Sequence, residues 1–110
     1  MTKETEKTLV IIYAEYQRRR SFGTSRREAA RFTPERLKAI DAFSSSDWSD
    51  IRYSLFQLKK LGYLKVGIYD DVELLDLGIE YMESKPKEFF TAFAGALKDL
   101  IPIVLSAIGA

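Results

Sequence analysis

Arginine gives this sequence its clearest chemical character. Residues 17–36, QRRRSFGTSRREAARFTPER, contain seven arginines and two glutamates, a local net charge of +5. The whole chain has a net charge of +1, so the remaining residues together carry −4. Guanidinium groups bind phosphate and carboxylate oxygens, so one basic face could bind a polyanion although the protein is nearly neutral.

The same arginines also have a purely structural interpretation. Arg18, Arg19 and Arg20 fall at the end of a predicted helix, where positive charge complements the helix dipole. The arginines could also form salt bridges with the acidic remainder of the chain and improve solubility. The excess of arginine over glutamate favours polyanion binding over this alternative.

The chain contains no histidine and no cysteine. This composition excludes the usual zinc sites, Ser-His-Asp triads and Cys-His pairs. An enzyme would have to rely on carboxylates, lysines or tyrosines, and the sequence shows no close acidic constellation. We therefore expect no enzymatic activity and no cofactor. The lack of cysteine also excludes a disulfide framework and favours a cytoplasmic location.

Length and composition predict one folded unit. The 110 residues are 46% hydrophobic and 13% aromatic, which is enough for a packed core. The N-terminal residues MTKETEKTLVII lack the apolar core of a signal peptide. The uncharged run over residues 100–110 is too short to span a bilayer, so we expect no transmembrane segment.

Three helices are predicted in the first half of the chain. Apolar residues at helical spacing predict a first helix over residues 4–20: Leu9, Ile12, Tyr13 and Tyr16. Ser25 and Glu28 fit a capping box, which predicts a short helix over residues 26–31. Thr33 followed by Pro34 predicts another helix start. Its buried face is expected to contain Leu37, Ile40 and Phe43.

A longer helix over residues 47–61 follows, capped by Ser46 or Asp47. Gly62 suits the left-handed backbone conformation that often ends a helix. The predicted buried stripe of the helix comprises Trp48, Ile51, Leu55, Leu58 and Leu61. Leu64 and Val66, then Val72 and Leu74, alternate as in a β-hairpin. Asp76 is expected to cap a helix that ends before Pro86. A last helical segment from Lys87 should kink or break near Pro102.

This order of helices, followed by a hairpin and a further helix, resembles winged helix-turn-helix proteins. The residues that carry the resemblance are IRYSLFQLKKLGYL (51–64) and LLDLG (74–78). They are similar to the family pattern L-x-x-L-x-x-x-G-[YL]-[LI], after which the wing often returns as L-T-x-x-G. Leu75 stands where the family has threonine. The expected fold is mainly α with a small β-hairpin, divided into a winged-helix domain (1–85) and a C-terminal apolar helix (86–110).

The resemblance implies DNA binding, with helix 47–61 in the major groove. The implied base-contacting residues are Ser49, Arg52, Tyr53 and Gln57. The implied backbone-contacting residues are Arg18, Arg19, Arg20, Arg26, Arg27 and Lys60. Arginine and glutamine form bidentate hydrogen bonds to guanine and adenine, respectively. The alternative is that these side chains are only the solvated face of an amphipathic helix, which also carries Asp47 and Asp50.

The hairpin tip opposes DNA contact, because Asp70 and Asp71 would repel phosphate. The hairpin could be short and stand clear of DNA, could contact a protein, or could belong to a fold that binds no nucleic acid. The short connection over residues 67–71 favours the first alternative. A metal site formed with Glu73 is disfavoured, since the spacing lacks the glycine of a calcium loop.

The tail EFFTAFAGALKDLIPIVLSAIGA contains a broad apolar stripe at helical spacing: Phe89, Phe93, Leu97, Leu100 and Val104. An exposed stripe of this size is usually an interface, so we expect a homodimer through this helix. Alternatively, the tail could fold back over its own helices and close the core. A membrane-surface helix is disfavoured because Lys98 is the only positive charge after Lys87.

The sequence thus predicts a small homodimeric transcriptional regulator that binds double-stranded DNA, with no evident small-molecule effector. The rival interpretation is a protein–protein interaction module of the same fold. That module would bind another protein through the acidic hairpin tip and the apolar tail, and the arginines would be part of that interface.

Overall fold

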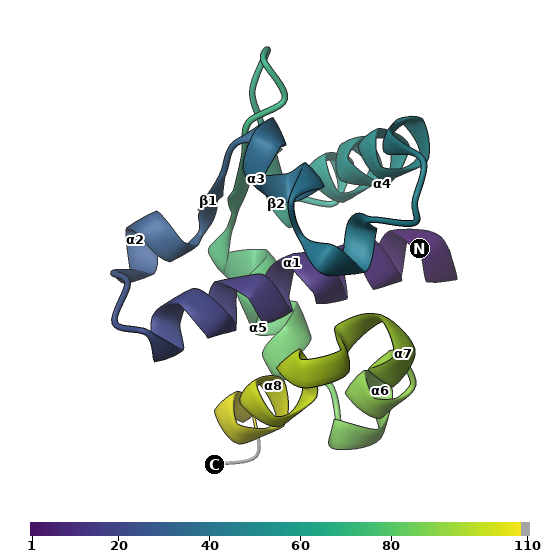
Figure 1. The fold of residues 1–110 in the computed structure, drawn as a ribbon. Coiled ribbons are helices and arrows are strands. Elements are labelled where there is room, and N and C mark those ends of the chain that lie inside the picture. The colour runs from purple at the N-terminus through teal and green to yellow at the C-terminus, as the bar shows by residue number, and fades with distance from the viewer. Residues whose placement is uncertain (109–110) are drawn as a thin grey trace.

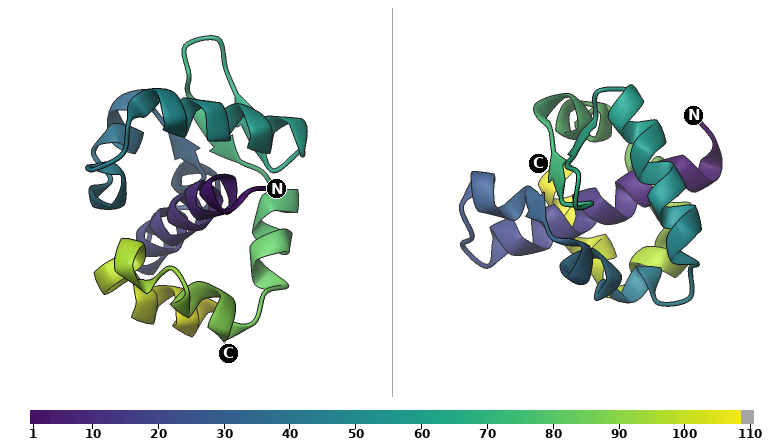
Figure 2. Two further views of the ribbon diagram at one scale, coloured as in Figure 1. Left: turned by 90° about the vertical axis from the view of Figure 1, so that its right-hand side faces the viewer. Right: turned by 90° about the horizontal axis from the view of Figure 1, so that it is seen from above.

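Helix α1 (Lys3–Ser21) runs through the middle of the computed structural model, which describes residues 1–108. Figures 1 and 2 show α3 and α4 on one side of α1 and the C-terminal helices on the other. Every residue from Leu9 to Ala14 is buried, as expected for a helix that is covered on all sides. The predicted helix and its buried stripe are confirmed, and the oxygen of Thr2 caps the first turn.

The short second helix ends earlier than predicted. Ser25 caps α2 (Arg26–Ala29) by accepting a hydrogen bond from the amide of Glu28. The chain then extends into strand β1 (Arg31–Phe32), of which Arg31 was predicted to belong to the helix. Phe32 is buried, and its pairing with the later hairpin makes the extended conformation favourable.

The next two predicted helices are confirmed. Thr33 caps α3 (Pro34–Lys38), and a single 3-10 turn, η1 (Asp41–Phe43), follows it. Helix α4 (Trp48–Lys60) begins after Asp47, whose carboxylate accepts from the amide of Ser49. The predicted core residues of this region are buried: Leu37, Ile40, Phe43, Ile51, Leu55 and Leu58. Trp48 is only partly buried.

The predicted hairpin is confirmed, but it belongs to a three-stranded antiparallel sheet. Strands β2 (Leu64–Val66) and β3 (Val72–Leu74) pair with each other, and β1 pairs with the other edge of β3. Gly62 has a φ of +81°, which allows the chain to reverse after α4. Leu61 was predicted to be buried and is 45% exposed instead. It lies at the C-cap, where the helical stripe no longer determines its direction.

Helix α5 (Asp76–Glu83) follows the hairpin and ends before Pro86, as predicted. The prediction that Asp76 caps it is wrong, because Leu75 occupies the N-cap and makes no side-chain cap hydrogen bond. Asp76 is the first residue of the helix, and its exposed carboxylate lies 3.6 Å from Arg26. A negative charge still suits this position, since the first turn is the positive end of the helix dipole.

The described part of the tail is a series of short helical segments. These are α6 (Lys87–Thr91), α7 (Ala94–Leu97), η2 (Lys98–Leu100) and α8 (Ile101–Ile108). The chain breaks at Lys98, with a φ of 48° and a ψ of −118°, and not at Pro102. Pro102 lies in the first turn of α8, where its missing amide hydrogen costs no helical hydrogen bond. Residues 109–110 of the predicted extension lie outside the described residues.

These segments pack against α1 of the same chain. Phe90, Leu97 and Val104 are buried in one apolar cluster with α1, whereas Phe89, Phe93 and Leu100 are partly buried at its edge. The prediction of one exposed helical stripe is therefore wrong, since the breaks in the chain turn its members in different directions. The alternative in which the tail closes the core describes this packing. Among residues 1–108, no helix is long and apolar enough to cross a membrane.

Candidate nucleic-acid interface

The N-terminal turn of α4 is fixed by Asp47. One carboxylate oxygen of Asp47 accepts from the amide of Ser49 at 2.9 Å and from the Ser49 hydroxyl at 3.0 Å. The pKa of Asp47 is lowered mainly by the hydrogen bond from the Ser49 backbone. Ser49 is exposed, but its hydroxyl hydrogen is engaged in this cap. It therefore has acceptor capacity left for a ligand.

The outward face of α4 combines polar and aromatic groups. Arg52 and Tyr53 are exposed, Gln57 is half-buried and Lys60 is exposed. The guanidinium of Arg52 stacks on the ring of Phe56, with 4.9 Å from Cζ to the ring centroid. The Nε of Arg52 also donates to the Asp70 carboxylate at 3.0 Å. These two contacts hold the guanidinium at one orientation between the helix and the hairpin.

Asp70 is not presented at the hairpin tip, contrary to the sequence prediction. It adopts a φ of 65°, a conformation that aspartate tolerates better than most residues, and its side chain turns back toward α4. Only 23% of that side chain is exposed. The tip presents Ile68 and Tyr69, which are 90% and 80% exposed. The predicted repulsion of phosphate is reduced, since Arg52 neutralises one of the two carboxylates.

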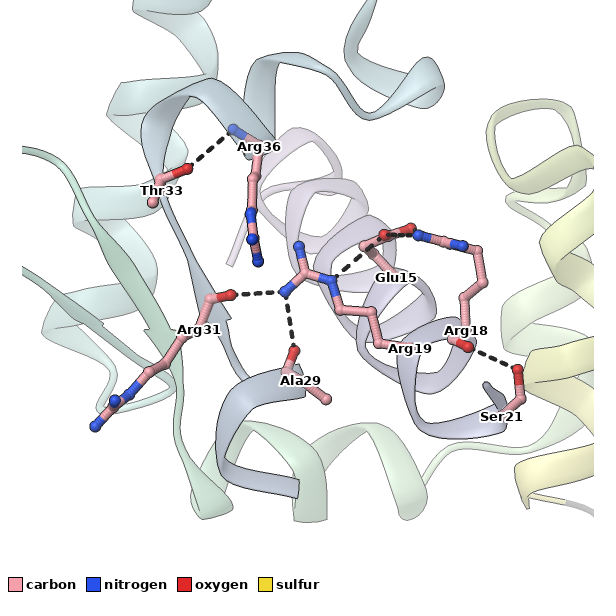
Figure 3. A network of polar contacts seen from close by, with 8 residues as sticks. All are labelled: Glu15, Arg18, Arg19, Ser21, Ala29, Arg31, Thr33 and Arg36. Carbon is pink, nitrogen blue, oxygen red and sulfur yellow. Dashed lines mark hydrogen bonds and ion pairs between the residues drawn. The ribbon is translucent and has the colours of Figure 1, made fainter. Parts of the chain in front are cut away.

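Arg19, the middle residue of the Arg18–Arg20 run, makes its contacts within the protein (Figure 3). Arg19 lies against Glu15 at 3.5 Å, and its Nη1 donates to the carbonyl oxygens of Arg31 and Ala29 at 2.6 and 3.3 Å. Its guanidinium stacks on Phe32 at 4.1 Å. The Arg19 side chain is only 12% exposed, and this burial is the main reason that its pKa is lowered. The burial does not fit the predicted contact of Arg19 with a DNA backbone.

Arg18 binds the same carboxylate from the other side. Its Nη2 and Nε donate to the two oxygens of Glu15 at 2.6 and 2.9 Å. These hydrogen bonds are the main reason that the pKa of Arg18 is raised. Arg18 remains partly exposed, but its fork is already occupied by a bidentate carboxylate.

The other predicted backbone-contacting arginines lie away from α4. Arg20, Arg26 and Arg27 are exposed at the end of α1 and on α2. Figures 1 and 2 show α2 and α4 toward opposite ends of α1. The structure therefore brings Arg52, Tyr53, Gln57 and Lys60 together on α4, but it does not place the three arginines on the same surface.

Sequence reasoning missed the groups that orient Arg52. Phe56 follows Arg52 by four residues, so their stacking could have been found from helical spacing. The Asp70 contact spans 18 positions and depends on the path of the hairpin, which no local sequence pattern indicates. The exposed apolar pair Ile68 and Tyr69 was not predicted either. Within residues 1–108, no group of three or more acidic side chains is arranged to hold a metal ion.

Comparison of the chain with protein-family models, with curated proteins and with solved structures gave no significant match.

Proposed function

We propose that this protein is a cytoplasmic DNA-binding regulator of the winged helix-turn-helix type, without enzymatic activity. Support comes from the order of α3, α4 and the β2–β3 hairpin, which agrees with the pattern that the sequence resemblance implies. Strand β1 adds a third strand at the base of this hairpin. The proposal does not require the tail-mediated homodimer predicted from the sequence.

The observation that carries the proposal is the position of Arg52. It lies on the exposed face of α4 and reaches the hairpin, so helix and hairpin form one continuous surface. Asp70 and Phe56 engage its Nε and its planar face. The Nη atoms make no hydrogen bond to another residue in the range 1–108. Two such nitrogens match the O6 and N7 acceptors of guanine in the major groove.

Binding of duplex DNA across a salt series tests the function. We expect the affinity of the full chain for a labelled random-sequence duplex to fall with salt, by a log–log slope of about −0.9 per phosphate contacted. Arg52→Ala should weaken binding by about 1–3 kcal/mol, measured on a duplex that the wild-type protein has selected from a random pool. Fluorescence anisotropy measures both quantities.

The matched control is Lys87→Ala, which removes one exposed positive charge from α6 on the other side of α1. It should leave affinity nearly unchanged. Absence of binding by the wild-type protein at low salt would contradict the proposal. Equal losses for the two variants would show that α4 has no special role.

Asp70→Asn should strengthen DNA binding. Asparagine tolerates the positive φ of this position and keeps an oxygen for Arg52, but it removes a negative charge beside the proposed DNA surface. We expect affinity for random-sequence DNA to rise about threefold at low salt, an effect that salt should diminish. Glu88→Gln, an exposed carboxylate change on α6, is the control. A weaker complex of Asp70→Asn would mean that the charge of Asp70 supports binding.

A protein–protein interaction module is the second candidate. It is favoured by Ile68 and Tyr69, because exposed apolar and aromatic side chains at one tip are typical of protein contacts. The salt series separates the candidates, since this module predicts no DNA binding. Asp71, one of the two aspartates that suggested such a module from the sequence, is also exposed beside Ile68 and Tyr69.

A further inference from the structure

A cavity of about 570 Å³ lies between α1, the α3–η1 segment and the turn from α7 into η2. It is separate from the α4 surface. Arginines from α1 and α3 line one part of it, and Ile40, Leu97 and Leu100 supply apolar lining. The volume is within the range of cavities that bind small molecules. A lining that combines charged and apolar side chains suits a ligand with a charged head and a short apolar body.

The arginine wall has more positive charge than the protein neutralises. Glu15 is shared by Arg18 and Arg19, and Figure 3 shows the Arg36 side chain directed toward the guanidinium of Arg19. Within residues 1–108, Arg36 forms no ion pair and its guanidinium makes no hydrogen bond. Three guanidinium groups thus face one carboxylate.

The other charged residues of the cavity do not remove this excess. Lys98 and Asp41 pair with each other at 3.3 Å, and both are well exposed at the rim. Asp99 is an exposed carboxylate on the tail side. The lining therefore retains a net charge of +1 from four basic and three acidic residues.

Burial adds to the effect of the excess positive charge on Arg19. Its pKa is lowered first by burial, and the neighbouring charges of Arg36 and Arg18 lower it further, against the opposite effect of Glu15. A buried cation among like charges is stabilised when an anion enters. Planar guanidinium groups bind carboxylates with paired hydrogen bonds.

We propose that this cavity binds a small organic carboxylate with a short apolar body. Arg36 holds the carboxylate, because its guanidinium has no partner within residues 1–108 and lies beside the occupied pair of Arg18 and Arg19. The apolar body rests on Ile40, Leu97 and Leu100. Such a ligand joins α3 to the tail. This inference does not depend on DNA binding.

Titration of the full chain with 4-methylpentanoate tests the inference, and two-dimensional amide NMR provides the readout. We expect saturable shifts in the amides of residues 39–42 and 96–100, with a dissociation constant of about 1 mM or lower. The neutral 4-methylpentanamide should cause no such shifts, because it lacks the charge. Arg36→Gln should weaken carboxylate binding about tenfold, the effect of losing a charge-assisted hydrogen bond.

Arg27→Gln is the matched control, since it removes an exposed arginine outside the cavity, and its binding should equal that of the wild type. Arg36 is exposed, so its variant should fold, which its own amide spectrum verifies. The inference is overturned if the carboxylate leaves the cavity amides unshifted or if Arg36→Gln binds as well as the wild type. Inorganic phosphate binding as tightly as the carboxylate would overturn the role of the apolar wall.

Discussion

Arg19→Ala is expected to destabilise the protein by about 3 kcal/mol, a large part of the 5–15 kcal/mol typical of a domain. The truncation removes the donor to two backbone carbonyls and leaves Glu15 with Arg18 alone. It also removes the stacking on Phe32 of the sheet. The lost hydrogen bonds and the space left by the side chain both disfavour the folded state.

Urea denaturation followed by circular dichroism measures this effect. The urea concentration at the midpoint should fall, while the slope of the unfolding free energy against urea stays unchanged. This is expected for a loss of stability without a change in unfolding mechanism. Arg20→Ala is the adjacent control, because Arg20 is exposed and, among residues 1–108, donates only to the carbonyl of Thr24. It should change stability by no more than about 0.5 kcal/mol. Equal midpoints for the two variants would refute the internal role of Arg19.

The contrast between these neighbouring arginines shows where sequence reasoning ends. Arg19 and Arg20 have the same chemistry and lie in the same run, so local patterns cannot separate them. Their difference arises because β1 places the carbonyl of Arg31 and the ring of Phe32 beside one of them. That strand has two residues, and its partner β3 lies far along the chain. A strand of two residues is too short to show a periodic pattern from which it could be predicted.

Features determined by neighbouring residues were predictable. The cap at Thr33, the reversal at Gly62 and the alternation of the hairpin each depend on a few adjacent positions. The break at Lys98 was not, since a lysine with positive φ carries no signal comparable to glycine or proline. The helical spacing of the apolar residues therefore predicts one continuous stripe, although the segment changes direction.

The candidate DNA surface divides in the same way. Exposure of Arg52 and Tyr53 follows from the helical positions of the buried leucines of α4, so it was predictable. The direction of Asp70 was not, because it depends on the path of the hairpin connection. The resulting ion pair neutralises one of the two tip carboxylates, while Asp71, Ile68 and Tyr69 remain exposed.

Phe90→Ala should destabilise the folded chain by about 3–5 kcal/mol. Phe90 is fully buried, and its ring centroid lies 6.2 Å from that of Tyr13 on α1 and 5.1 Å from that of Phe89. Removing the ring leaves a cavity between the tail and the central helix. The size of this effect distinguishes two roles of the tail. If the tail packs in the core of its own chain, Phe90→Ala destabilises the fold; if the tail is an interface between chains, the substitution would weaken association more than folding.

Urea midpoints at two protein concentrations, tenfold apart by design, separate these cases. We expect the wild-type midpoint to be independent of concentration and the Phe90→Ala midpoint to be lower at both. Phe22→Ala is the matched control, because Phe22 is largely exposed at the end of α1. A wild-type midpoint that rises with concentration, together with an unchanged Phe90→Ala midpoint, would instead support tail-mediated association. If the tail packs within its own chain, the wild-type midpoint must not change with protein concentration. Only contacts between chains make unfolding depend on concentration.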